Sequence, residues 1–218
     1  MQRFFDKLRM RWLTVILFAV IAGVFTGVMM LIPVLKNTSF QNIGINLECW
    51  VVFAVIIVTK CDKPAEAMLK CFVFFLISQP LVYLTEIIFG TLTVEKALIY
   101  YRQMWLPLTI ATLPGGLIAY FCKKQNFGGC LILALGNTIL LLMGISYTVQ
   151  CIAAFPRHLL SAVFCYGSVV ALSFGVQEEK RRRILTLGLT VLFAAAVILL
   201  LKMSNRYLLD LGNGISFP

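Results

Sequence analysis

The sequence predicts an all-α integral membrane protein, a bundle of about seven transmembrane helices with its N-terminus cytoplasmic and its C-terminus outside. Of the 218 residues, 61% are hydrophobic and 13% are charged, and the mean hydropathy is +0.94. A water-soluble domain has nearer half apolar and a quarter charged residues, so this chain cannot cover a globule with polar surface. The apolar runs are long and continuous, which predicts helices, because the strands of membrane barrels alternate over short segments.

Seven segments are each long enough, or nearly so, to cross a hydrocarbon core of about 30 Å at about 1.5 Å per residue. We predict a single polytopic transmembrane domain over residues 1–218, with spans at about 12–35, 45–60, 65–90, 104–122, 127–149, 157–176 and 184–203.

The first segment follows a basic start, MQRFFDKLRMRW, as the hydrophobic region of a signal peptide also does. Its apolar run is about twenty residues long, which exceeds the usual length of that region, and no small-residue cleavage site follows it. We therefore interpret it as the first transmembrane helix, retained in the mature protein.

The second segment is short and carries Glu48 in its first turn, so a re-entrant segment is the alternative. That alternative would reverse the sidedness of everything that follows. With seven spans, thirteen of the 19 lysines and arginines lie on the cytoplasmic side, as the positive-inside rule favours. Without the second span, the basic runs at 123–124 and 180–183 would lie outside, so the charges favour seven.

The third segment contains SQPLVYLTEII, in which a carboxylate and a proline interrupt an apolar run. At about 100° per residue, Gln79, Tyr83 and Glu86 share one stripe of the helix. Pro80 has no N–H, so the carbonyl of Leu76 loses its helical donor. A carboxylate inside a membrane marks a functional site or a paired charge, and a structural bridge from Glu86 to an arginine is the competing interpretation.

The fourth segment continues the polar pattern on its own stripe. The stretch YYRQMW brings Arg102 and Trp105, and Thr109, Thr112 and Gly116 follow on the face of Trp105. The prolines of LPLTIATLPGG predict a bent or locally opened helix, which membranes tolerate where it lines a cavity or packs on protein.

The fifth and sixth segments add polar residues of two kinds. Asn137, near the middle of the fifth, is expected to make an interhelical hydrogen bond. The sixth opens with FPRH, where Pro156 is a candidate helix start and Arg157 and His158 would occupy the first turn.

Small residues recur at spacings of four in two segments, at positions 19, 23 and 27 and at positions 167, 171 and 175. Such stripes allow close helix packing, either within this bundle or against another subunit. The seven cysteines have no CxxC or histidine spacing that would hold a metal, and only Cys49 and Cys151 are placed to form a disulfide at the outer face.

Together these residues predict a polar site in the outer half of the bundle. Two acids, two arginines, the single histidine and several aromatics would gather at one depth, although side chains of these types also occur as ordinary interface residues. The expected ligand-binding residues are Glu86, Glu48, Gln79, Tyr83, Arg102, Trp105, Thr109, Thr112, Arg157 and His158. In this hypothesis Glu86 is the central charge, the two arginines are its anion-side partners and His158 carries protons.

Three function classes follow, in this order of preference. The first is a multi-pass membrane protein with an outward-facing polar pocket that binds or transports a small polar solute or ion. The second is a membrane subunit that recruits partners or oligomerises, and the third is an intramembrane enzyme acting on lipid. The sequence has no HExxH or GxSxG, and we predict no catalytic residue, metal site or cofactor.

The expected location is the cell membrane, the inner membrane of a cell that has two. The net charge of +10 is interpreted as topological, because the short loops house no nucleic-acid platform. The expected partners are the bilayer, anionic lipid headgroups at the cytoplasmic face, and either a membrane protein or a second copy of this chain.

Overall fold

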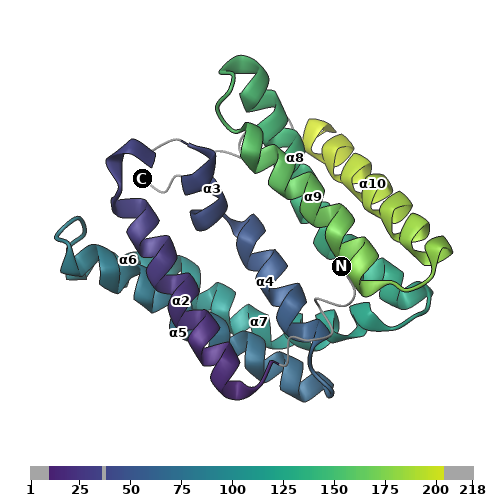
Figure 1. Cartoon of the computed structure of the whole chain (residues 1–218), viewed down its shortest axis with the longest axis horizontal. Coiled ribbons are helices and arrows are strands. Elements are labelled where there is room, and N and C mark those ends of the chain that lie inside the picture. Colours follow the sequence, from purple (N-terminus) through teal and green to yellow (C-terminus); the bar gives the residue numbers. More distant parts are fainter. Residues whose placement is uncertain (1–9, 36–37, 204–218) are drawn as a thin grey trace. The chain divides into compact units, whose positions relative to one another are not determined.

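The computed structural model describes residues 10–35 and 38–203, apart from the side chains of residues 44 and 45, and they are helical with no strand (Figure 1). The helices are α2 (Trp12–Leu31), α3 (Ser39–Ile45), α4 (Leu47–Thr59), α5 (Pro64–Ile88), α6 (Val94–Tyr100), α7 (Leu106–Ala119), α8 (Phe127–Ala153), α9 (Leu159–Val176) and α10 (Lys180–Met203). Short 3₁₀ turns occupy Pro33–Leu35 (η1) and Tyr120–Lys123 (η3), and a π-helical turn occupies Tyr101–Trp105 (η2).

Six stretches of the described residues are long and apolar enough to cross a membrane: Trp12–Leu31, Pro64–Ile88, Val94–Lys123, Phe127–Ala153, Leu159–Val176 and Lys180–Met203. The helix Leu47–Thr59 is apolar but shorter. Large apolar side chains remain exposed along these helices, including Ile21 at 65% and Leu192 at 62%. This pattern is that of a multi-pass membrane protein, whose outer faces meet lipid.

The described residues fall into two compact units, and the boundary passes through α4. One unit comprises 10–35 and 53–121, and the other comprises 38–52 and 122–203. We describe each unit separately.

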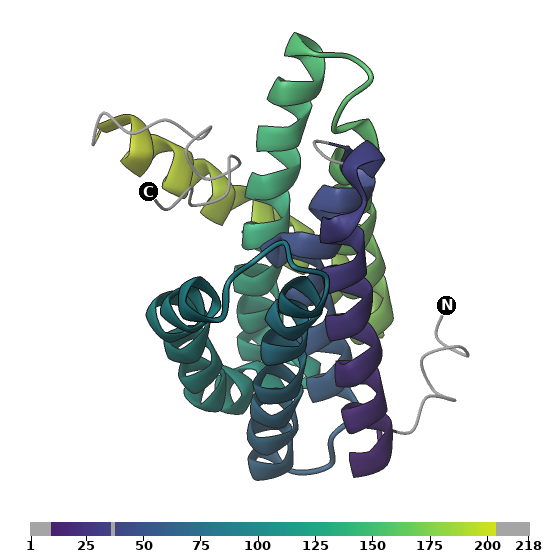
Figure 2. The same ribbon diagram turned by 90° about the vertical axis from the view of Figure 1, so that its left-hand side faces the viewer.

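In the first unit, α2 and α5 lie side by side and run in the same direction (Figure 2). At their starts Lys70 donates hydrogen bonds to the carbonyl of Met10 and to Glu66. Further along, Gly23 lies against Ser78 and Leu81. Residue numbers increase in the same direction along α2 and α5 at their contact, so the two helices are parallel.

Glycine is required where α2 meets α5. A Cβ on Gly23 would lie 2.5 Å from the main-chain oxygen of Ser78, and a Cβ on Gly27 would lie 2.6 Å from the Cβ of Thr85. The small-residue stripe of the first segment therefore packs within the chain, as one of the two interpretations predicted.

Residues 53–59 run antiparallel to α5 within the same unit. The ring of Phe53 packs edge-on against that of Phe74 with centroids 6.0 Å apart, and both contact Phe18 on α2. The thiol of Cys71, earlier on α5, contacts the carbonyl of Ala54, later on α4. Residue numbers increase along α4 while those of its contacts on α5 decrease, so this part of α4 runs toward the start of α5.

The helix α7 packs antiparallel on α5. A Cβ on Gly116 would lie 3.1 Å from the Cα of Met68, so Gly116 sits near the beginning of α5. The chain reaches α7 through α6 and η2, in which the N–H of Leu106 bonds to the carbonyl of Tyr101, five residues earlier. Pro107 has no N–H to continue the ladder, which accounts for a widened turn at this position.

In the second unit, α8 and α9 form an antiparallel hairpin and α10 packs on both (Figure 1). Asn137 on α8 donates a 2.9 Å hydrogen bond to the hydroxyl of Ser173 on α9. This bond confirms the interhelical role predicted for Asn137. At Gly144 a Cβ would lie 3.0 Å from the ring of Tyr166, so the hairpin is closely packed there too.

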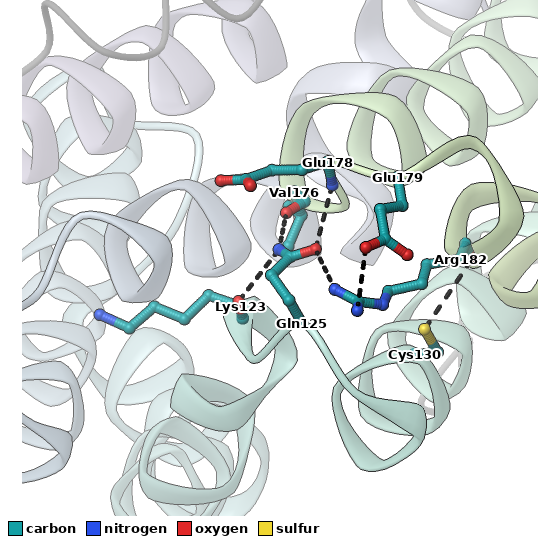
Figure 3. Close-up of polar contacts among 7 residues, drawn as sticks. All are labelled: Lys123, Gln125, Cys130, Val176, Glu178, Glu179 and Arg182. Carbon is teal, nitrogen blue, oxygen red and sulfur yellow. Dashed lines mark hydrogen bonds and ion pairs between the residues drawn. The ribbon is translucent and has the colours of Figure 1, made fainter.

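The turns at one end of this unit are fastened by Gln125 (Figure 3). Its amide nitrogen donates to the carbonyls of Val176 (2.9 Å) and Lys123 (3.2 Å). Its amide oxygen accepts from the N–H of Glu178 (3.1 Å) and from Arg182 (3.3 Å). One side chain thereby ties the turn before α8 to the turn between α9 and α10.

Several element boundaries differ from the sequence prediction by a few residues, and two of them lie beside predicted site residues. The fourth span was predicted from residue 104, but helix begins at Val94 and continues through η2, because Thr93 is an extended residue that starts α6. The sixth span was predicted from residue 157 with Pro156 as its start. Instead α9 begins at Leu159, after a turn in which His158 has φ 65°.

Some predictions concern residues outside those described. The locations of both termini, and with them the basic residues at 3, 7, 9 and 206, fall in 1–9 and 204–218. The cysteines are free, so Cys49 and Cys151 are not joined by a disulfide in this structure.

Candidate functional site

The predicted site residues divide between the two units. Gln79, Tyr83, Glu86, Arg102, Trp105, Thr109 and Thr112 belong to the first unit, and Glu48, Arg157 and His158 belong to the second. Each group is therefore considered by itself.

In the first unit, the polar stripe of α5 faces the polar stripe that runs from η2 into α7. The side chains of Tyr83 on α5 and Trp105 on η2 lie close to each other. The ring of Tyr101 packs edge-on against Tyr83 with centroids 6.5 Å apart. We call the facing residues Gln79, Tyr83, Glu86, Trp105 and Thr109 the α5–α7 polar face.

The antiparallel register places Gln79 level with Thr109. Gln79 lies one turn before Tyr83 on α5 and Thr109 one turn after Trp105, on the same faces of the two antiparallel helices. Both side chains are buried, at 1% and 0% exposure. The amide nitrogen of Gln79 and the hydroxyl of Thr109 nevertheless have no hydrogen-bond partner among the described residues.

Glu86 lies on the α5–α7 polar face near the C-terminal end of α5. Its side chain is half-buried, and within the described part of the chain its carboxylate makes no ion pair with Arg102, which is exposed. The structural bridge between Glu86 and Arg102 is therefore not formed. Thr112, the remaining predicted residue here, donates from its hydroxyl to the carbonyl of Thr109 at 2.6 Å.

In the second unit, Glu48 lies just after a break between α3 and α4. Asn46 at the break has an extended backbone, with φ −79° and ψ 168°. The Nδ2 of Asn46 donates to the hydroxyl of Tyr147 at 2.5 Å, and that hydroxyl donates to Oε1 of Glu48 at 2.9 Å. Glu48 and Tyr147 are both 0% exposed.

His158 joins the same group from the turn before α9. Its imidazole stacks on the ring of Tyr147, with centroids 5.9 Å apart and an interplanar angle of 12°. Its Nδ1 is 2.6 Å from Nδ2 of Asn42, which makes Nδ1 the acceptor. We call Asn42, Asn46, Glu48, Tyr147 and His158 the Glu48 cluster.

The imidazole of His158 is held neutral. Burial lowers its pKa below the ordinary value of 6.5, and the charge of Arg157 lowers it further. The side chain of Arg157 is exposed and takes no other part in the cluster. His158 is the half-buried member, whereas Glu48 is fully enclosed.

Sequence reasoning had named Glu48 and His158 but not the residue that joins them. Tyr147 lies 99 residues from Glu48, within an apolar run where a tyrosine is unremarkable. Asn42 and Asn46 gave a usable signal, since asparagines between two apolar runs are typical of a helix break. No spacing rule connects any of them to Tyr147.

The two groups have different chemical character. The α5–α7 polar face offers unpaired neutral hydrogen-bonding groups beside a carboxylate, which suits a polar solute. The Glu48 cluster offers a buried carboxyl held by a phenol. Neither resembles a metal site, and no group of three or more His, Cys, Asp or Glu side chains within 10–35 and 38–203 could hold a metal ion.

The described residues are all-α, and their six helices of membrane-spanning length and apolarity are compatible with a multi-pass membrane protein. Comparison with known proteins finds no matching protein-family model, no matching curated protein and no matching solved structure.

Proposed function

We propose that the protein crosses the cell membrane seven times, with its N-terminus inside, and binds or transports a small polar solute or ion at an outward-facing site. The six long helices support the membrane location. The direction of two of them supports the seventh crossing.

Because α2 and α5 run parallel, the chain must return across the membrane once between them. The 13 residues of α4 span about 20 Å, less than the core of about 30 Å. Together with α3 they form a broken helix long enough for the return. A re-entrant segment would instead leave α2 and α5 antiparallel.

The observation that carries the site is the pair of unpaired polar atoms, Nε2 of Gln79 and Oγ1 of Thr109, buried at one level of the α5–α7 polar face. A buried polar group without a hydrogen bond costs free energy, and a ligand or ordered water that meets it removes that cost. Pro80 and Pro114 also lack the N–H groups that would bond to the carbonyls of Leu76 and Ile110, which leaves those acceptors available. Glu86 lies at the outer end of this face.

Thiol labelling tests whether this face is open to the outside. In a full-length protein with its seven cysteines replaced, Glu86→Cys is treated in intact cells with a membrane-impermeant thiol reagent. Glu86→Ser sets the background, and Glu95→Cys, at an exposed position of α6, sets the maximum rate. We expect rapid labelling of Glu86→Cys; labelling at the background rate would place residue 86 against protein or lipid and remove the outward site.

A second experiment addresses the solute. Purified protein is heated with a panel of amino acids, sugars, nucleosides and inorganic ions, and its unfolding temperature is measured. We expect at least one compound to raise it, because ligands that bind only the folded state stabilise it. Glu86→Gln should unfold at the same temperature without the compound and lose the increase. An unchanged increase in Glu86→Gln would contradict the assignment of Glu86.

The alternative function, recruitment of a partner, was suggested by the two small-residue stripes, and only one of them is still available for a partner. The small-residue stripe of α2 is occupied by α5, whereas Gly167 on α9 has open space beside it. If the protein recruits a partner, α9 is the helix that would present the stripe. Isolation from native membranes in a mild detergent distinguishes the two functions, since a monodisperse single chain counts against recruitment.

A further inference from the structure

The Glu48 cluster contains an acid that no partner fully satisfies. Oε1 of Glu48 accepts the hydrogen bond from Tyr147, but Oε2 has no hydrogen-bond partner among the described residues. The side chain is 0% exposed and follows directly on the break at Asn46. In membrane transporters, ion sites commonly form at breaks between two half-helices.

Among the described residues of its unit, no lysine or arginine forms an ion pair with this carboxyl. The titratable groups that interact with it are Tyr147 on α8, Cys165 on α9 and Cys49 on α4, and each of these is uncharged in its ordinary protonated form. The described ion pairs lie elsewhere, at Lys70 and Arg182. Hydrogen bonds from Tyr147 and from the main chain of Glu48 stabilise an enclosed carboxylate only in part, so its burial favours neutralisation of the charge by something that binds.

The hydrogen bonds specify what binds. The two hydrogen bonds of this series both point toward Glu48, since Asn46 donates to Tyr147 and Tyr147 donates to Oε1. A protonated carboxyl has one oxygen that accepts and one that carries hydrogen, which matches a bonded Oε1 and a free Oε2. A metal cation would require several oxygen ligands with their lone pairs turned inward, and the phenol's hydrogen is turned inward instead.

We propose that Glu48 is a proton-binding site whose occupant sits on Oε2. Binding forms the Oε2–H bond with a proton taken from hydronium and leaves water; release returns the proton to water and leaves the carboxylate. The half-buried His158, stacked on Tyr147, gives the cluster its contact with the surroundings. This site requires nothing of the α5–α7 polar face and stands whether or not a solute binds there.

Infrared spectroscopy of the full-length protein in phosphatidylcholine vesicles tests the proposal. At pH 7 the wild type should show a carboxylic C=O stretching band that is absent from Glu48→Gln and retained in Glu86→Gln. Transfer to D₂O should shift the band, because the bound proton exchanges with water. Strong alkali should abolish it reversibly.

Tyr147→Phe supplies a signature that a purely structural role of Glu48 would not produce. Removing the phenol leaves the carbonyl oxygen Oε1 without its donor, so the C=O band should move to higher frequency without losing intensity. This variant also keeps the proposal testable if Glu48→Gln fails to fold. A matched variant, Tyr166→Phe, loses a hydroxyl whose partner is Thr148 and should leave the band unmoved.

Three outcomes would overturn the proposal. Absence of the band in wild-type protein at pH 7 would mean that Glu48 is ionised. A band that persists in Glu48→Gln would belong to another acid. A band at pH 7 that disappears when sodium chloride replaces choline chloride would assign the site to a sodium ion in competition with the proton.

Discussion

The hydroxyl of Tyr147 on α8 lies 2.9 Å from the carboxylate oxygen Oε1 of Glu48 on α4 and donates to it. Both side chains are fully buried, and Asn46 donates to the same hydroxyl from the break between α3 and α4. The phenol of Tyr147 therefore holds both the break at Asn46 and the first turn of α4. The broken helix is also the segment that must return the chain between α2 and α5.

We predict that Tyr147→Phe lowers the free energy of unfolding by about 1–2 kcal/mol, because the buried Glu48 and the half-buried Asn46 each lose a hydrogen-bond partner. Tyr166→Phe removes one hydrogen bond from a half-buried site and should cost less. Denaturant unfolding of both variants in detergent micelles measures the difference. Equal losses would mean that the Glu48 cluster contributes nothing beyond an ordinary hydroxyl contact.

The stability of the protein should fall in mild acid because of His158. Burial and Arg157 hold its pKa below 6.5 in the folded protein, whereas the unfolded chain titrates near that value. Above pH 6.5 both states are neutral and the contribution is complete. As the pH falls below 6.5 the unfolded chain takes up the proton first, so stability decreases until the lower pKa of the folded state is passed.

His158→Asn provides the control, since asparagine does not titrate and tolerates the positive φ of this position. His158 is the single histidine of the chain, so the imidazole contribution is lost entirely. Unfolding temperatures measured from pH 8 to pH 5 should decline less steeply in the variant. Identical slopes would show that the imidazole is protonated equally in both states.

Gly23→Ala should destabilise the protein by about 1–3 kcal/mol, because the new methyl group would overlap the main chain of Ser78. Gly167→Ala serves as the comparison, since it places the same methyl group in open space on another helix. Thermal unfolding, monitored by size-exclusion chromatography, measures the stability of both variants. A stable Gly23→Ala variant would mean that α2 and α5 do not approach as closely as described.

Gln125→Ala should loosen the turns shown in Figure 3, because four hydrogen bonds end on this side chain. We expect faster cleavage between α9 and α10 by a protease added to the purified protein. Glu178→Ala is the matched control, since Glu178 contributes its main-chain N–H and its side chain points away from Gln125 (Figure 3). Equal cleavage rates for the two variants would contradict the role of Gln125.

Composition and the length of apolar runs were sufficient to predict an all-α chain with membrane-length helices. These properties depend on each segment alone, since a membrane helix satisfies its own backbone. The stripes of α5 and α7 were also predictable, because helical periodicity assigns residues such as Tyr83 and Trp105 to faces. Their proximity then follows from the antiparallel packing of neighbouring helices.

The remaining features depend on contacts distant in sequence. Nothing local to Glu48 indicates a phenol 99 residues away, and nothing local to Gly23 distinguishes packing on α5 from packing on another protein. The early start of the fourth span was missed for a different reason. Its first residues, including Glu95 and Lys96, are charged and exposed, which is typical of a loop as well as of an amphipathic helix end.

The parallel contact between α2 and α5 has a consequence for biogenesis. Ser78 is synthesised 55 residues after Gly23, which corresponds to roughly 3–11 s at translation rates of about 5–20 residues per second. During that interval the face of α2 that carries Gly23 and Gly27 lacks the helix that packs against it. The helix α2 is therefore made before the helix that covers its glycines, and their contact must wait for the synthesis of α5.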